Sequence, residues 1–375
     1  MSNLPGDPWH FPRPMLAEQY LATFEVGLIS ARALFAARRM GKSQFLEKDL
    51  IPAARARGYV TAYVNLWDAR RYPLSTLLAV IGRAVEPTGW HKLLKRLKRP
   101  LKHLKASAKV SGMVEGTLEA ALADEPASVT QPLLSELIRG FSSSDRRMLL
   151  VLDEAQVLAA ADQADLSHAL RAALDSRKAN IKVVFAGSSE VTLRRMFGRA
   201  REPFYNWAAL EPFELLGREF VQSMVTKVNR LSRFPLNLED ALHAYEALHR
   251  TPEFLRRFLT RYLEYAELGV DAALTATRSH IFNDQHFAEV WTHLTPAARI
   301  ALRLLARGQT DLFSSAARAR FASKARARQR VTLSHVQNAL RVLLRAELIV
   351  RQERGEYQIV DPMWVEWLRE RAHVP

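Results

Sequence analysis

The feature that most constrains the fold of this chain is the alternation of short apolar stretches with helical stretches in its first half. In three of the stretches the apolar run passes into polar or acidic residues: GYVTAYVNLWD at 58–68, RRMLLVLDEAQVLA at 146–159 and NIKVVFAGSSE at 180–190. A fourth, LISARALFAA at 28–37, mixes apolar and small residues. In segments between them, such as QFLEKDLIPAARARG, apolar residues recur at helical spacing. This order predicts a parallel sheet covered by helices on both faces.

The stretch FAARRMGKSQF at 35–45 lies where the first expected strand passes into a helix. It ends in Gly41, Lys42 and Ser43, as a phosphate-binding loop does, but it begins with Ala36 where such loops usually have glycine. Backbone N–H groups at a helix N-terminus attract phosphate, the lysine reaches the β- and γ-phosphates, and the serine binds Mg²⁺. Because Gly41 lies against the phosphates and the first position can accommodate a Cβ, we expect Ala36 to be tolerated. The residues expected to line the nucleotide are Ala36, Ala37, Arg38, Arg39, Met40, Gly41, Lys42, Ser43 and Gln44.

A second motif follows at the end of the apolar stretch from Met148 to Leu152, where Asp153 and Glu154 stand side by side. We expect Asp153 to complete the Mg²⁺ shell with Ser43, and Glu154 to polarise the attacking water. Each motif alone occurs by chance. Their combination in this order, with a further strand ending in small polar residues, predicts a nucleotide-binding α/β fold.

The segments ARRMGKS, LLVLDEAQ and VVFAGSS, followed by a helical region and a C-terminal winged helix, resemble AAA+ P-loop ATPases. The likeness is to the archaeal-type ATPase branch, near the signalling (STAND) and origin-recognition or transposition-regulator ATPases. The resemblance implies that Lys42 and Ser43 are Walker A residues, and that Asp153 and Glu154 are the Walker B pair. It also implies ATP and Mg²⁺ as cofactors, slow and regulatory hydrolysis, and Ser188 or Ser189 as the polar sensor-1 residue.

An arginine-rich helix end, VTLRRMFGRAREPFY at 191–205, follows the last apolar stretch. The resemblance implies that it faces a neighbouring subunit, with Arg199 and Arg201 as candidate arginine fingers acting in trans and Arg194 and Arg195 as weaker candidates. An arginine beside the charge that develops on a transferring phosphate can accelerate the reaction by about 10³–10⁵-fold. The alternative interpretation is a solvated basic helix end.

From Leu215 onward the apolar spacing is helical, and three domains are expected: an α/β nucleotide-binding domain at 1–210, a helical lid at 211–290 and a winged-helix domain at 291–375. In the lid, RTPEFLRRFLTRY at 250–262 resembles a motif that carries a sensor-2 arginine, here Arg256 or Arg257. Thr251 replaces the glycine of that motif, and a solvent-facing arginine is the alternative.

The C-terminal segment has the sequence signals of a winged helix. We expect Thr295 to cap a helix that begins at Pro296. We expect the equivalent of a recognition helix at 332–349, with the sequence TLSHVQNALRVLLRAELI. A hairpin is expected at 349–360, with the sequence IVRQERGEYQIV. Such domains bind either DNA or protein, and both interpretations stay open here.

Charge favours an anionic partner. The chain has 54 Lys and Arg against 39 Asp and Glu, which gives a net charge of +15 and a pI near 10.2. Eight Lys or Arg and no acid occur at 91–109, inside an expected insertion at about 91–115, and six lie between Arg318 and Arg330. We expect both runs to contact the phosphate backbone of duplex DNA, in a salt-sensitive and weakly sequence-specific way. Solvated faces, or a membrane surface for the amphipathic first run, are the alternatives.

The absence of cysteine excludes disulfides and thiolate metal sites. With no secretory signal and no long apolar run, we expect a cytoplasmic protein without a membrane partner. The combined interpretation is a homo-oligomeric, ATP-dependent switch on DNA that recruits a partner enzyme such as a transposase. The alternatives are a signalling or scaffold ATPase whose winged helix binds protein, and a protein that binds nucleotide without hydrolysing it.

Overall fold

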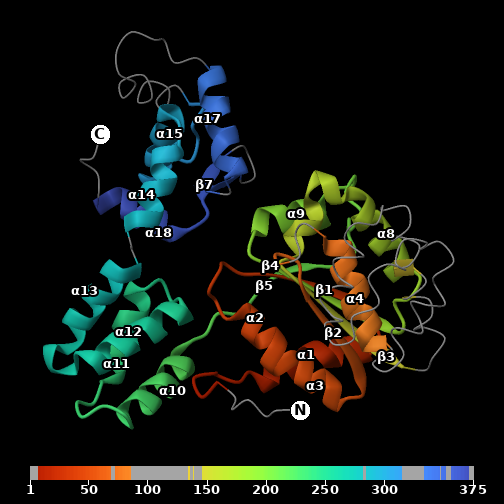
Figure 1. The fold of residues 1–375 in the computed structure, drawn as a ribbon, viewed down its shortest axis with the longest axis horizontal. Coiled ribbons are helices and arrows are strands. Elements are labelled where there is room, and N and C mark those ends of the chain that lie inside the picture. Colours follow the sequence, from red (N-terminus) through yellow and green to blue (C-terminus); the bar gives the residue numbers. More distant parts are fainter. Residues whose placement is uncertain are drawn as a thin grey trace, which may run out of the picture. The chain divides into compact units, whose positions relative to one another are not determined.

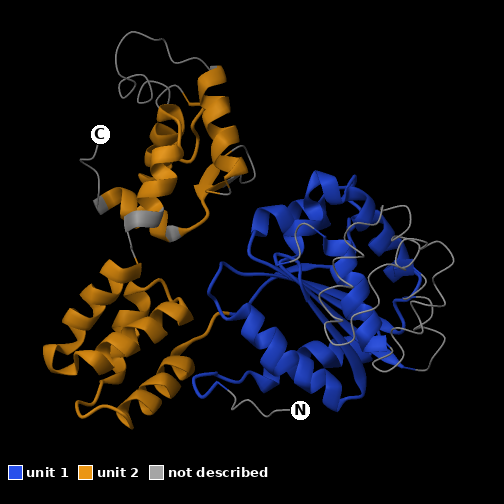
Figure 2. Cartoon of the chain, viewed as in Figure 1, with its two compact units in different colours: residues 1–214 blue, residues 215–375 orange. Residues whose placement is uncertain are grey.

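The computed structural model describes residues 7–68, 72–85, 134–135, 138, 146–281, 284–314, 333–346, 348–351 and 356–370. The chain divides into two compact units, Met1–Glu214 (unit 1) and Leu215–Pro375 (unit 2), coloured blue and orange in Figure 2. The two basic runs, at 91–109 and 318–330, lie outside the described residues, as does the expected hairpin turn at Arg354 and Gly355. None of the described helices combines the length and the apolar character needed to cross a bilayer.

Unit 1 is built on a five-stranded parallel sheet with the strand order β2-β3-β4-β1-β5 (Figure 1). Its strands are β1 (Ala31–Phe35), β2 (Tyr59–Asn65), β3 (Arg147–Asp153), β4 (Ile181–Gly187) and β5 (Leu210–Pro212). The first four confirm the expected strands. The edge strand β5 was not expected, because three residues are too few to show a periodic pattern.

Helices cover both faces of this sheet, as expected. One face packs against α1 (Pro14–Glu25) and a continuous helical run formed by α2 (Lys42–Phe45), the π-helical η1 (Leu46–Leu50) and α3 (Ile51–Ala56). The other packs against α4 (Pro73–Val85), α8 (Ala164–Asp175), α9 (Glu190–Gly198) and the short η2 (Ala155–Ala159), which is followed by η3 (Ala161–Gln163). Alternation along β3 divides its side chains between the two cores: Val151 faces α1 and α3, whereas Leu150 faces α4 and α8.

The strand register brings the loops that carry chemistry to one edge of the sheet. Phe35, the last residue of β1, pairs with Gly187, the last residue of β4, and Asn65 at the end of β2 pairs with Asp153 at the end of β3. Because all these strands are parallel, their carboxyl ends meet at the same edge, where parallel α/β sheets place ligands.

Unit 2 begins with a group of helices: α10 (Arg218–Asn229), α11 (Leu238–Ala247), α12 (Pro252–Glu264), η4 (Ala266–Leu268) and α13 (Gly269–Ile281). It continues with α14 (Asp284–His293), α15 (Pro296–Ala306), α17 (Leu333–Arg345), an antiparallel hairpin of β6 (Ile349–Arg351) and β7 (Tyr357–Ile359), and α18 (Pro362–Glu370). Thr295 caps α15 as expected, accepting a hydrogen bond from the Ala298 N–H over 3.2 Å. Helices α15 and α17 followed by the hairpin are the arrangement of a winged helix.

Candidate nucleotide-binding site

The loop after β1 places Lys42 and Ser43 at the carboxyl edge of the sheet. Gly41 has φ +83°, in the left-handed region that favours glycine, and it starts α2. Ala36 continues the pairing with β4, because its N–H donates to the Gly187 carbonyl over 3.2 Å. The methyl group of Ala36 lies in the apolar core beside α1 and α2, with 7% of the residue exposed. A Cβ at the first loop position is therefore packed against the protein.

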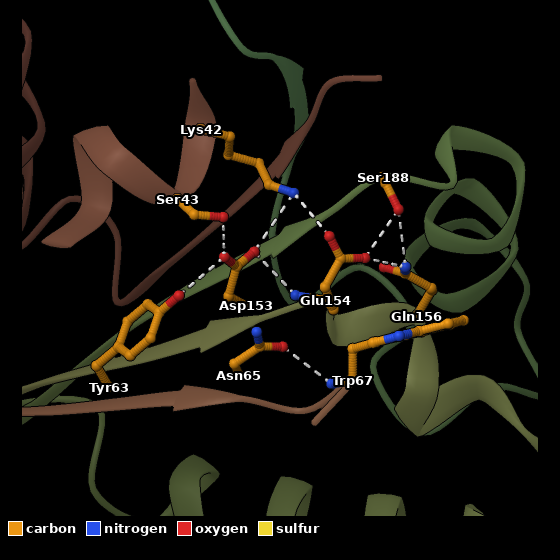
Figure 3. Close-up of polar contacts among 9 residues, drawn as sticks. All are labelled: Lys42, Ser43, Tyr63, Asn65, Trp67, Asp153, Glu154, Gln156 and Ser188. Atoms are coloured by element: carbon orange, nitrogen blue, oxygen red, sulfur yellow. Dashed lines mark hydrogen bonds and ion pairs between the residues drawn. The ribbon is translucent and has the colours of Figure 1, made fainter. Parts of the chain in front are cut away.

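Lys42 lies between the two adjacent carboxylates at the end of β3, those of Asp153 and Glu154. Its Nζ is 3.3 Å from Asp153 Oδ1 and 3.5 Å from Glu154 Oε1, and its side chain is buried (Figure 3). The Ser43 hydroxyl donates to Asp153 Oδ2 over 2.5 Å. Four residues that the sequence predicted to act together, from segments more than one hundred positions apart, are thus joined by direct contacts.

Asp153 is fully buried, and its oxygens are held by more donors than the sequence indicated. The Glu154 N–H donates to Oδ1 over 2.9 Å, and the Tyr63 hydroxyl donates to Oδ2 over 3.1 Å. Burial, together with the negative charges of Asp153 and Glu47, raises the pKa of Tyr63 well above its usual value, so its hydroxyl stays protonated. Tyr63 was not anticipated, since an aromatic residue in a half-buried strand has the pattern of an ordinary core residue.

Glu154 adopts a left-handed backbone conformation with φ +53°, which turns its side chain toward Ser188 at the end of β4. The Ser188 hydroxyl donates to Glu154 Oε2 over 2.8 Å, and Gln156 Nε2 donates to the same oxygen (Figure 3). Glu154 Oε1 is the oxygen that faces Lys42. Gln156 was not anticipated either, although it lies in the quoted motif LLVLDEAQ.

The two serines after β4 have different surroundings. Ser188 contacts Glu154 and Gln156, whereas Ser189 caps α9, where its Oγ accepts from the Thr192 N–H over 3.4 Å and donates to Thr192 Oγ1 over 2.8 Å. Of the two sensor candidates, the geometry brings only Ser188 to the acidic pair.

The arginine candidates also separate into two kinds. Arg194 pairs with Glu190 at 2.7 Å, and Arg195 donates to the Ala159 carbonyl over 2.9 Å. Arg199 and Arg201 follow the end of α9 and are exposed, and within the described part of the chain neither has a side-chain partner. Both are available to another molecule, whereas Arg194 and Arg195 are engaged within this one.

The lid candidates lie in unit 2. Arg256 and Arg257 are half-buried residues of α12, and Arg257 pairs with Glu253 one turn earlier. A sensor-2 role for Arg256 stays a prediction.

The side chains at the carboxyl edge of the sheet are of the kinds that bind Mg²⁺ and phosphate. Within the described ranges there is no group of three or more histidines and carboxylates that could hold a metal ion unaided. Mg²⁺ is commonly held by one or two carboxylates together with substrate phosphates and water, and Ser43 and Asp153 present oxygens of the required kind. The left-handed Gly41 and the Lys42 ammonium are of the kind that could contact phosphate.

Comparison of the fold with solved structures gives likenesses over nearly the whole chain. A Walker-type ATPase of Pyrococcus abyssi is 17% identical with a TM-score of 0.62, covering 96% of each chain. The ORC2 protein of Aeropyrum pernix in its ADP form is 15% identical with a TM-score of 0.57, covering 96% of this chain and 94% of that one. The same protein in ADPNP-ADP complexes is 16% identical with a TM-score of 0.52, covering 96% and 93%.

No family model and no curated protein matches the sequence. At these identities the structural likenesses establish the fold. They confirm the predicted α/β P-loop architecture with additional helical parts, which is similar to the folds of the Walker-type ATPase and of the ORC2 protein.

Proposed function

We propose that this chain, which has the fold of the archaeal-type AAA+ P-loop ATPases, binds ATP with Mg²⁺ and hydrolyses it. The observation that carries this proposal is the convergence of Lys42, Ser43, Asp153 and Glu154 within hydrogen-bonding distance at the carboxyl edge of a parallel sheet. The ADP and ADPNP-ADP forms of the similar Aeropyrum pernix protein support adenine nucleotide as the ligand.

The roles follow from the chemistry of each side chain. Lys42 would leave the two carboxylates and neutralise the β- and γ-phosphates, while Ser43 and Asp153 would hold Mg²⁺, which offsets the negative charge of the phosphates. Glu154 would orient the attacking water and accept its proton, and Ser188, bonded to Glu154 Oε2, would contact the same region. The main chain of 36–44 would surround the phosphates.

Completion of the site by a second copy of the chain is part of the proposal. Arg199 and Arg201 are exposed beyond α9 and are of the residue type that stabilises charge on a transferring phosphate. ATP would then drive self-association, and hydrolysis, slow in the isolated chain, would reset the assembly. Arg256 is proposed as an additional phosphate contact from α12.

We further propose that the assembly binds duplex DNA through its basic surfaces. Residues 291–375 include fifteen Lys and Arg and seven Asp and Glu, so that +8 of the total charge of +15 belongs to the winged-helix segment. Arg341 and Arg345 are exposed on α17, the equivalent of a recognition helix. Contacts of this kind are made mainly to phosphates and weaken with salt. In this proposal the protein acts in the cytoplasm, as a switch that recruits a DNA-processing partner such as a transposase.

Two measurements test these proposals separately. Phosphate release from Mg·ATP by the wild-type protein is compared with that of Glu154→Gln, for which we expect a rate lower by about 10²–10⁴-fold with ATP binding retained. Equal, background-level rates would leave a protein that binds nucleotide without hydrolysing it. Gel shift with duplex DNA, with and without a non-hydrolysable ATP analogue, tests the second proposal. Failure to bind DNA in a salt-sensitive way in either state would assign the winged helix to a protein partner.

A further inference from the structure

Gln156 joins Glu154 to Ser188 in a closed set of hydrogen bonds. Its amide Nε2 donates to Glu154 Oε2 and lies 3.1 Å from Ser188 Oγ, while Ser188 Oγ donates to that same Glu154 oxygen over 2.8 Å (Figure 3). Gln156 is 7% exposed, so water has little access to replace these bonds. Both amide hydrogens are therefore committed, one to the carboxylate and one to the hydroxyl.

The carbonyl oxygen of this amide lies against Gly187. Gln156 Oε1 is buried without a hydrogen-bond partner. A Cβ on Gly187 would lie 2.3 Å from Gln156 Oε1 and 2.9 Å from Leu193 Cδ1. Gly187 is not among the described residues with positive φ, so the glycine is required there for space and not for backbone conformation.

Rotation of the amide by 180° would bring Oε1 against the Glu154 carboxylate, where the two oxygens would repel each other. The observed orientation thus directs both amide hydrogens of Gln156 at oxygen acceptors, despite the cost of an unpaired carbonyl oxygen. With Oε2 held by Gln156 and Ser188, Glu154 presents Oε1 toward Lys42. That oxygen is left to accept a proton at the phosphate-binding edge.

We propose that Gln156 is a positioning residue for hydrolysis, which fixes the direction of Glu154 and couples it to Ser188, and that Gly187 is required because it leaves room for the Gln156 amide. This inference rests on the proposed ATPase activity. It predicts a selective loss of turnover when the amide is removed or displaced, since Gln156 itself contacts neither Lys42 nor Ser43 within the described hydrogen bonds.

The first test compares Gln156→Ala with Gln163→Ala, a partly exposed glutamine seven positions along the same segment. For Gln156→Ala we expect kcat to fall by about 10- to 100-fold, the equivalent of a hydrogen bond to a charged group, with unchanged affinity for a non-hydrolysable ATP analogue. Gln163→Ala should keep the wild-type kcat. A wild-type kcat in Gln156→Ala, or an equal loss of analogue affinity, would overturn the inference.

The second test displaces the amide without removing it. Gly187→Ala should lower kcat to a similar degree, whereas Gly198→Ala, whose Cβ would meet nothing within 4 Å, should not. If Gly187→Ala acts through Gln156, the double variant Gly187→Ala with Gln156→Ala should be no slower than Gln156→Ala alone. If the two substitutions lower kcat by factors that multiply in the double variant, Gly187 acts through residues other than Gln156. If Gly187→Ala does not fold, the comparison of Gln156→Ala with its control still decides the role of Gln156.

A third readout needs no nucleotide. The free energies of unfolding of Glu154→Ala, Gln156→Ala and the double variant should be non-additive, because both single changes break the same bond. Additive changes in the free energy of unfolding would contradict the hydrogen bond between Gln156 and Glu154. Should the wild-type protein fail to hydrolyse ATP, the proposed function fails, and this unfolding cycle still tests the tie between Gln156 and Glu154.

Discussion

Ser43 and Asp153 share a hydrogen bond of 2.5 Å that links the start of α2 to the end of β3. Asp153 is fully buried, and the same Oδ2 atom also accepts from Tyr63 over 3.1 Å. The two proposed Mg²⁺ ligands are therefore hydrogen-bonded to each other. Metal binding would replace one short hydrogen bond with two coordination bonds, while Tyr63 keeps the carboxylate in place.

Substitution of Ser43 by alanine should separate nucleotide binding from the effect of magnesium. Because Lys42 and the loop backbone remain, we expect ATP to bind, while the dependence of turnover on Mg²⁺ concentration shifts to higher values and kcat falls by about 10- to 100-fold. A magnesium titration of phosphate release measures both quantities. Ser176→Ala, at the exposed end of α8, is the matched control. An unchanged magnesium dependence in Ser43→Ala would remove Ser43 from the metal site.

Substitution of Lys42 by methionine should reduce both ligand affinity and stability. The phosphates would lose a cationic partner, which costs about 2–5 kcal/mol of binding free energy for a desolvated charge pair. In the free protein, Asp153 would keep the hydrogen bonds from Ser43, Tyr63 and the Glu154 N–H, so we expect a loss of only about 1–3 kcal/mol in the free energy of unfolding.

Titration with an ATP analogue and denaturant unfolding measure the two effects of Lys42→Met. The control is Lys48→Met, six residues further along the same helical run, whose ammonium pairs with Asp7 at 3.2 Å and is partly exposed. Tight analogue binding by Lys42→Met, with the control unchanged, would contradict the proposed phosphate site.

The site residues that the sequence predicted are those that can be identified from their immediate neighbours in the chain. Gly41, Lys42 and Ser43 are consecutive, Asp153 and Glu154 end an apolar strand, and Ser188 follows the next one, so each could be assigned to a strand end. The sheet register then brings these ends together without further information. The loop at 36–43 needed no exact match to its motif, because the methyl group of Ala36 is packed in the core.

The residues that the sequence did not predict contact side chains from neighbouring strands or from distant segments of the chain. Tyr63 has the pattern of a core residue on β2, and only the pairing of β2 with β3 brings its hydroxyl to Asp153. The link between Gln156 and Ser188 depends on the left-handed turn at Glu154, and the need for glycine at 187 depends on the amide that lies against it. Such contacts join different segments, so the spacing of residues within one segment does not reveal them.

Tyr20 predicts how stability changes in alkali. It is 5% exposed, and burial, reinforced by the charge of Glu211, raises the pKa of Tyr20 from 10.0 to about 12. Between these values an unfolded chain has lost the Tyr20 proton that the folded chain retains. Tyr20 alone should therefore lower the free energy of unfolding by about 2–3 kcal/mol as pH rises from about 10 to about 12. Urea unfolding of the full chain at a series of pH values measures this change.

Tyr20→Phe should flatten the decline relative to wild type, whereas Tyr205→Phe, at an exposed position, should leave it unchanged. The same slope in wild type and Tyr20→Phe would contradict the assignment.

Arg199 and Arg201 are the proposed arginine fingers, and substituting them tests whether the site needs a neighbouring subunit. Both are exposed beyond α9, so their removal should leave the folded subunit and its ATP binding intact. If they act in trans, the double variant Arg199→Ala with Arg201→Ala should lose about 10³–10⁵-fold in kcat. Arg194→Ala, which removes an exposed pair with Glu190 and a contact with the Phe35 ring, should retain activity.

Mixing two inactive variants distinguishes action in trans from action within one chain. The arginine double variant has an intact acidic pair, and Glu154→Gln has intact arginines. In a mixed assembly, some sites combine Glu154 from the first variant with Arg199 and Arg201 from the second, so phosphate release should reappear on mixing and reach its maximum near equal amounts. The concentration dependence of wild-type turnover should show the same requirement for association. Inactivity of every mixture, with wild-type turnover per subunit independent of concentration, would mean that each chain completes its own site.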